Sequence, residues 1–393
     1  MNSACITRKE TNNDRTWVQD VIVSLLLVVC AAYKFSFLPV DFMRILRIGS
    51  VALLFLMHFK ALRRLPHLAA VVQFGVVIVV STIVANGGTN NILYALLQGF
   101  TILSFFITFY DLKDKYGIDE LLRPLFAILF ILCLLNDTTV ITASVNVSDT
   151  MYLIGNKFTT GNLHTLVVAL YAAFLMKKHG YVLCNWGIYW ILVGWTVFVL
   201  VKAQAMTVLL GFLLSVLITV FLSKKAKDLL LNGWFFMAVL VVCNLVYFGT
   251  GYLLQNDMVQ YFVSNVLGRS LTMTGRTPIY DSLEMIIGAR PMFGWGYGTD
   301  IVERVVGYGN AQNGVADIAV HYGVIGVVSA ALLAISVLRP TAKKSPYAFA
   351  LVGVFYAAIL TSMAEITFGL TFFLRLALLA TLLSGSELEG GRR

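Results

Sequence analysis

Long apolar runs, separated by short polar segments, follow one another along most of the chain. A helix that spans a membrane needs about 20 predominantly apolar residues. The pattern therefore predicts an all-α, polytopic integral membrane protein with about 12 transmembrane helices. Only Ala364 and Glu365 separate the last two runs, so a count one lower stays open. The predicted spans lie near Trp17–Tyr33, Arg44–Phe59, Leu68–Ala85, Ile92–Tyr110, Leu121–Ile141, Leu163–Met176, Asn185–Val201, Ala205–Leu222, Leu231–Leu254, Gly314–Leu338, Tyr347–Met363 and Ile366–Leu383.

The composition agrees with this prediction. Hydrophobic residues make up 59% of the chain and charged residues only 12%, whereas about a quarter of the residues in soluble domains are charged. The net charge is +9, but the basic residues lie between the apolar runs instead of forming one basic surface. We therefore expect no nucleic-acid partner. The five cysteines form no CxxC pair and the histidines lack metal-ligand spacing, so neither a metal nor a cofactor is expected.

The lysines and arginines predict how the chain is oriented. Short cytoplasmic loops of membrane proteins carry an excess of these residues. Placing the N-terminus in the cytoplasm puts most of the 29 Lys and Arg residues on the cytoplasmic side. Both termini are then cytoplasmic, and residues 255–313 form one long extracytoplasmic loop before the third-last helix. We expect a single membrane domain covering residues 1–393, with its active site in that loop, since a loop of this length is usually functional or disordered.

The predicted loop contains a segment with helical spacing and three short motifs. Thr277–Gly288 places Ile279, Leu283, Ile286 and Ile287 on one face, which predicts an ordered helix on the membrane surface. The motifs are Thr274-Gly275-Arg276 with Tyr280, then Pro291-Met292-Phe293-Gly294-Trp295-Gly296-Tyr297-Gly298, then Gln312-Asn313 leading to Gly323 and Gly326.

This ordered set of motifs resembles the O-antigen polymerase/ligase family, and Leu267–Thr272 resembles its capsular and exopolysaccharide polymerase branch. The resemblance implies a GT-C-like glycosyltransferase architecture in the bacterial plasma membrane. It also implies an enzyme that polymerises polyprenyl-pyrophosphate-linked oligosaccharide repeat units into capsular polysaccharide, exopolysaccharide or O-antigen at the outer face of that membrane. Its partners would be this lipid-linked glycan, the bilayer, a flippase and a chain-length regulator.

Two alternatives remain open at this point. An O-antigen ligase would transfer finished polymer to another acceptor, and a flippase or transporter would move a lipid-linked glycan. The family carries a histidine at the position of Gln312, where ligases are thought to use it as a base, so the glutamine favours a polymerase. A transporter usually shows paired half-repeats with broken helices, and no such pairing is visible in the sequence.

Four residues are the candidate catalytic groups. Arg276 and Arg290 would bind pyrophosphate, since guanidinium groups match phosphate oxygens in pairs; the alternative is a solvated or lipid-headgroup arginine. Asp317 would activate an acceptor hydroxyl, unless it only forms a structural pair with His321. Glu365 would supply a second carboxylate, unless it caps a turn.

The remaining candidates would bind substrate. Gln312 and Asn313 come just before the third-last span, and His321 lies within it. Asn313, Asp317 and His321 are spaced four residues apart and form a polar ladder on one helix face. Trp295 and Tyr297 could stack on sugars or anchor the loop at the interface. Lys157 and Asn162 lie together in an external polar patch. Arg44 and Arg47 form a pair of cations that could bind lipid phosphate, although contact with lipid headgroups is the favoured alternative.

Overall fold

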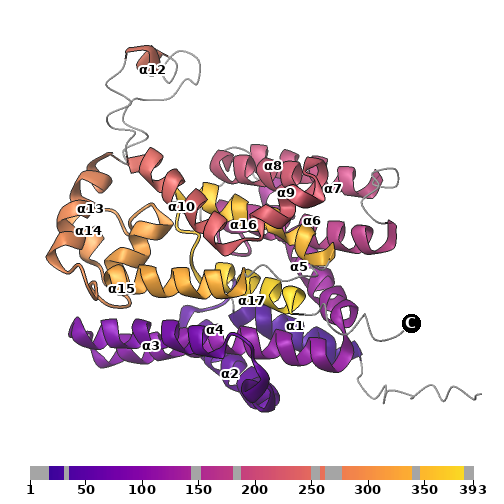
Figure 1. The fold of residues 1–393 in the computed structure, drawn as a ribbon, viewed down its shortest axis with the longest axis horizontal. Helices are drawn as coiled ribbons and strands as arrows, with labels where there is room; N and C mark the ends of the chain where they lie inside the picture. The colour runs from indigo at the N-terminus through magenta and orange to yellow at the C-terminus, as the bar shows by residue number, and fades with distance from the viewer. Residues whose placement is uncertain are drawn as a thin grey trace, which may run out of the picture.

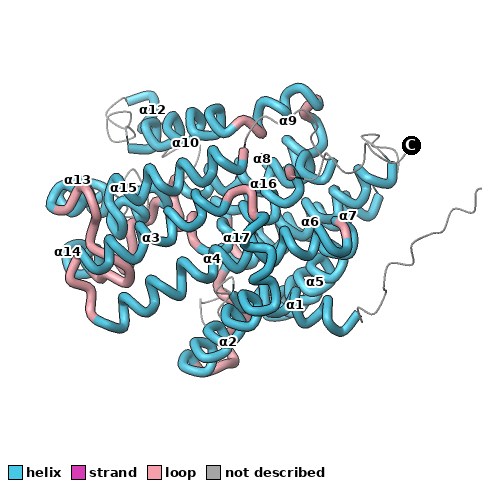
Figure 2. The backbone as a smooth tube through the Cα atoms, turned by 60° about the horizontal axis from the view of Figure 1, so that its bottom comes forward, coloured by secondary structure: helices cyan, strands magenta, loops and turns pink. Residues whose placement is uncertain are grey.

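Helices account for the regular structure in the part of the chain that the computed structural model describes, residues 17–30, 35–142, 152–179, 187–248, 257–261, 277–338 and 346–384. Figure 2 shows that helices make up most of the described backbone. Every one of the predicted apolar spans contains a helix. The helices are α1 (Trp17–Cys30), α2 (Val40–His58), η1 (Phe59–Arg64), α3 (Leu68–Val84), α4 (Thr89–Tyr116), α5 (Ile118–Thr142), α6 (Lys157–His179), α7 (Gly187–Lys202), α8 (Met206–Phe221), α9 (Lys224–Leu230), α10 (Gly233–Phe248), α12 (Asp257–Tyr261), α13 (Thr277–Ala289), α14 (Ile301–Val306), α15 (Gly314–Val337), α16 (Pro346–Ser362) and α17 (Leu370–Leu383).

Length and composition make this a membrane-embedded chain. Among the described residues, five helical segments are long and apolar enough to cross a bilayer: α2 with η1, α4, α5, α6 and α15. The pair α9 and α10 is bent by 73° and makes a sixth if it counts as one span. Shorter apolar helices are α3, α7, α8, α16 and α17. The full number of spans and their orientation stay predictions.

The apolar helices pack into one bundle. Helix α16 lies against α6 and α8, α4 lies against α3 and α17, and α15 runs alongside α3 (Figure 1). Their buried side chains form one continuous hydrophobic core. Many large apolar side chains face outward, Leu56 and Ile191 among them, as expected where lipid replaces water.

The predicted surface helix is present as α13, one residue longer than expected. Its apolar face packs inward: Ile279, Leu283 and Ile286 are almost completely buried in a second core. This core also takes residues from α14 and from the first half of α15. The face is therefore covered by protein, and α13, α14 and the first half of α15 form a subassembly at one end of the bundle (Figure 1).

Candidate functional site

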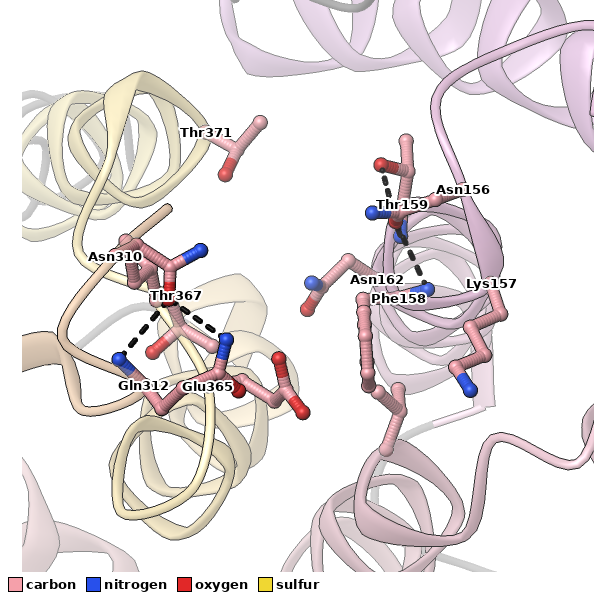
Figure 3. A pocket seen from close by; sticks show the side chains of 12 residues that line it. Asn156, Lys157, Phe158, Thr159, Asn162, Asn310, Gln312, Glu365, Thr367 and Thr371 are labelled. Carbon is pink, nitrogen blue, oxygen red and sulfur yellow. Dashed lines mark hydrogen bonds between the residues drawn. The ribbon is translucent and has the colours of Figure 1, made fainter. Parts of the chain in front are cut away.

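A polar cavity of about 510 Å³ opens where segments far apart in the sequence meet (Figure 3). Its volume is in the usual range for small-molecule sites. The walls come from the start of α6, from the segment before α15 and from the connection between α16 and α17. All three segments belong to the side that the basic-residue pattern predicts to be extracytoplasmic. The lining residues are Asn156, Lys157, Phe158, Thr159, Asn162, Val208, Asn310, Gln312, Glu365, Ile366, Thr367 and Thr371.

The α6 wall is fixed by a helix cap. The Asn156 side-chain oxygen accepts hydrogen bonds from the backbone N–H groups of Phe158 and Thr159, at 3.1 and 3.0 Å. An amide at this position satisfies N–H groups that the helix itself leaves without partners. The Lys157 ammonium group lies 5.4 Å from the centre of the Phe158 ring. Amide, ammonium and aromatic groups are thus held together on one wall.

Buried polar residues of α5 anchor the same wall from behind. Asn136, which is fully buried, donates to Thr160 Oγ1 at 2.6 Å and accepts from the Ile154 N–H at 3.1 Å. The adjacent Asp137 contacts His164 Nε2 at 2.9 Å and accepts from Trp195 Nε1 at 2.7 Å. These bonds tie α5, α6 and α7 together, so the position of the α6 wall is set by polar contacts as well as by packing.

The opposite wall carries the carboxylate. Glu365 follows the end of α16, and Figure 3 shows its side chain and that of Asn162 pointing toward one another across the cavity. Gln312 lies beside Glu365 and donates from Nε2 and from its backbone N–H to Asn310 Oδ1, at 2.7 and 3.0 Å. Its backbone has a φ of 52°, in the left-handed region that few residues other than glycine adopt.

This lining suits a ligand rich in hydroxyl groups. Amides and hydroxyls from both walls can donate and accept hydrogen bonds, and Phe158 offers an apolar ring face. A carboxylate that faces such a ligand can take a proton from a hydroxyl. Among the described residues, no group of three or more His, Cys, Asp or Glu side chains could hold a metal ion.

The glycine-rich motif lies away from this cavity and completes a broken helix. At Gly323 the chain has φ 64° and ψ −165°, which interrupts α15. The carbonyl groups of Val320 and His321, left without helical partners, accept from the N–H groups of Trp295 and Gly296, both at 2.8 Å. Beyond the break, the Val324 and Ile325 N–H groups donate to the carbonyls of Pro291 and Met292. Where a helix is interrupted inside a membrane, the freed backbone N–H and carbonyl groups must find hydrogen-bond partners within the protein.

Close backbone approach explains the glycines at this junction. A Cβ atom on Gly323 would lie 2.2 Å from the Met292 carbonyl oxygen, and one on Gly294 would lie 2.6 Å from the Val320 carbonyl oxygen. Both glycines also have positive φ, which costs other residues free energy. Gly294, Gly296 and Gly298 have φ values of 66°, 81° and 69°, so the backbone of the motif turns tightly at each of them.

Arg290 and Tyr297 hold this junction to α3, and Trp295 ties it to α13. The Arg290 guanidinium donates to the carbonyl of Ala85 at the end of α3, at 3.2 Å, and lies 4.5 Å from the Trp295 ring centre. Trp295 Nε1 donates to the Ile286 carbonyl at 2.8 Å, and the Tyr297 N–H donates to Thr82 Oγ1 at 3.0 Å. None of the three lines the polar cavity.

The predicted polar ladder Asn313–Asp317–His321 is present but also lies outside the cavity lining. Asn313 is fully buried and caps α15, accepting from the N–H groups of Val315 and Ala316, while it donates to Asn244 on α10 at 3.0 Å. His321 Nδ1 lies 2.8 Å from the Asp317 carbonyl oxygen and 3.7 Å from its carboxylate. The proximity of Asp317 and His321 is therefore confirmed.

The two remaining predicted cations, Arg44 and Arg47 of α2, contact different partners. Arg44 pairs with Asp41 at 2.9 Å on the exposed surface of α2 and lies near the Tyr94 ring, and Arg47 donates to Gln98 Oε1 at 3.0 Å. Neither lines the cavity. Arg276 and the Thr274-Gly275-Arg276 motif lie outside the described residues.

Of the predicted site residues in the described chain, the structure brings Lys157, Asn162, Gln312 and Glu365 to one cavity. Sequence reasoning missed Asn310, Thr371, Asp137 with His164, and Arg375 as parts of this region. A charged or amide side chain inside an apolar run was the available signal, and Asn136-Asp137 and Arg375 both showed it. Asn310 and Thr371 had no such signal.

The chain was also compared with known proteins. It matches no model of a protein family, and it has no match among the curated proteins. Its resemblance to the polymerase/ligase family therefore rests on the motifs alone.

Proposed function

We propose that the chain is a glycosyltransferase that joins lipid-linked oligosaccharide repeat units into a polysaccharide at the outer face of a bacterial plasma membrane. The observation that carries the proposal is the polar cavity, because three segments that were separately predicted to be extracytoplasmic supply its walls. The motif resemblance supplies the reaction class. The cavity supplies a site whose groups suit that reaction.

Glu365 is the proposed general base. It is the carboxylate among the cavity-lining residues, whereas Asp317 lies outside that lining. The oxygen of the acceptor hydroxyl attacks the anomeric carbon of the donor glycan, and its proton passes to Glu365. The new glycosidic C–O bond forms as the bond from the anomeric carbon to the pyrophosphate oxygen breaks, so polyprenyl pyrophosphate leaves. Correct placement of both substrates supplies much of the rate in a reaction of this kind.

The proposal is tested in a strain that lacks this chain. Polymer should disappear, and single lipid-linked repeat units should accumulate on the outer face. Plasmid-borne wild-type protein should restore polymer length, and Glu365→Gln should not restore it when inserted at the same level. Accumulation of repeat units on the inner face would indicate a flippase instead. Full-length polymer that stays on its lipid carrier would indicate a ligase.

A further inference from the structure

A buried cation contacts the backbone of a residue that lines the polar cavity. Arg375 of α17 is only 5% exposed, and its guanidinium donates to the Asn162 carbonyl of α6 at 3.1 Å. Asn162 lines the cavity, and so does Thr371, one helical turn before Arg375 on the same face of α17. A charged group buried at membrane depth is costly and usually serves a site.

The α6 wall carries positive potential from two further sources. The side chain of Lys157 lines the cavity beside Phe158. The N-terminal end of the 23-residue helix α6 meets the cavity through Asn156, Phe158 and Thr159, and helix N-terminal ends carry a partial positive charge. Lys157 and the helix end lie on the α6 wall, and the Arg375 guanidinium of α17 adds positive charge where it meets the Asn162 carbonyl.

The carboxylate of Glu365 lies on the facing wall (Figure 3). An anionic group placed beside Glu365 would be repelled, whereas the α6 wall attracts it, and the difference grows where water is excluded. The cavity is thus electrostatically asymmetric, with a cationic α6 wall and an acidic wall formed by the connection between α16 and α17.

We propose that the α6 wall binds the pyrophosphate group of the lipid-linked donor, with Lys157 and the Asn162 side chain in contact with it. Arg375 is a positioning residue, which holds the Asn162 backbone and adds positive charge there. The inference rests on the proposed function and deepens it, because it assigns donor and acceptor to opposite walls. The acceptor hydroxyl then lies on the side of Glu365, where its proton is removed.

Binding of diphosphate probes to the purified full-length protein tests the assignment without an activity assay. Farnesyl pyrophosphate and inorganic pyrophosphate are titrated separately. Lys157→Ala should weaken farnesyl pyrophosphate binding about 10- to 100-fold, as expected for one lost charge-assisted hydrogen bond, while Lys157→Arg retains most of the affinity. Lys202→Ala is the matched control, since Lys202 ends α7 and does not line the cavity.

Arg375 and Glu365 variants extend the same titration. Arg375→Gln should weaken binding and Arg375→Lys should restore most of it, with thermal unfolding measured for both. Glu365→Gln should bind farnesyl pyrophosphate equally or more tightly, because a negative charge has been removed. Unchanged affinity in Lys157→Ala would overturn the inference even if Arg375 variants fail to fold. Equal affinity for farnesyl pyrophosphate and inorganic pyrophosphate would indicate that the α6 wall binds free diphosphate, and would overturn the proposal that its ligand is lipid-linked.

The two proposals fail differently. Loss of polymer in Glu365→Gln cells, with no diphosphate binding by the purified protein, would overturn the inference and leave the proposed function. Lys157-dependent binding by a protein whose deletion leaves polymer unchanged would overturn the proposed function.

Discussion

The polar cavity and the glycine-rich junction at Gly323 both contain predicted site residues, but they use those residues in opposite ways. In the cavity, side chains from three segments face a common space, as Glu365 and Asn162 do (Figure 3). At the junction, the polar groups are paired within the protein, backbone to backbone around the break in α15. The glycine-rich motif, which is easy to recognise in the sequence, therefore stabilises the fold. Most of the residues that line the cavity, which a ligand can enter, belong to no comparable motif.

This difference leads to separate expectations for the two regions. Substitutions at the junction should reduce the amount or the stability of the folded protein. Substitutions in the cavity should reduce reaction rate or affinity and leave the fold intact.

The largest effect is expected at Gly323. A methyl group there meets the Met292 carbonyl at 2.2 Å on a backbone with φ 64°, so Gly323→Ala should abolish accumulation of folded protein. The measurement is the level of membrane-inserted protein and its melting temperature in detergent. Gly194→Ala in α7 is the control, because a Cβ atom there has open space. Normal levels of Gly323→Ala would show that the break is not a requirement of the fold.

Glu365 should give the largest loss of rate without loss of protein. Removing a general base typically lowers the rate about 10²- to 10⁴-fold, so Glu365→Gln should abolish polymer at normal protein levels. Asp317→Asn is the comparison, and we expect it to retain most activity because Asp317 lies outside the cavity lining. Polymer length is read on gels and normalised to inserted protein. An active Glu365→Gln beside an inactive, stable Asp317→Asn would return the role of base to Asp317.

Arg290 should affect stability more than rate. Its contacts with the Ala85 carbonyl and the Trp295 ring join the loop to α3, and such a charge-assisted bond contributes about 1.5–3 kcal/mol. Arg290→Gln should lower the melting temperature, and the normalised polymerisation rate should stay near that of the wild type. Arg304→Gln is the control from the same predicted loop, because its ion pair with Asp300 is exposed and contributes little. Loss of rate at unchanged stability would instead support the predicted pyrophosphate role of Arg290.

The helices could be predicted from the sequence because their signal is local. Apolar runs and the spacing of Ile279, Leu283 and Ile286 are visible within a few turns. The break at Gly323 could not be predicted, since it depends on carbonyl groups of a segment about 30 residues earlier replacing the helical partners. The apolar spacing also could not predict whether the apolar face of α13 contacts lipid or other helices, because the same face would be buried in either case.

The cavity likewise depends on contacts between residues that are far apart in the sequence. Lys157, Gln312 and Glu365 were each expected near the outer side, but they come from segments separated by up to about 200 residues. Only the packing of α16 against α6 and α8, and of α17 against α4 and α15, brings them together. Arg375 was visible as a charge within an apolar run, but its contact with Asn162 required the bundle.

Substitution of Gln312 should give the smallest loss of polymerisation rate. It tests whether the hydrogen bonds between Gln312 and Asn310 support the part of the cavity beside Glu365. Its side chain and backbone N–H both donate to Asn310, so Gln312→Ala loses one side-chain bond beside Glu365 and keeps the backbone one. A net hydrogen bond contributes about 1 kcal/mol, which predicts a several-fold loss of polymerisation rate. Its φ of 52° adds a conformational cost that Asn tolerates better than Ala. Gln312→Asn should therefore melt at a higher temperature than Gln312→Ala. A complete loss of polymer in Gln312→Ala at normal protein levels would contradict this supporting role and place Gln312 in the reaction itself.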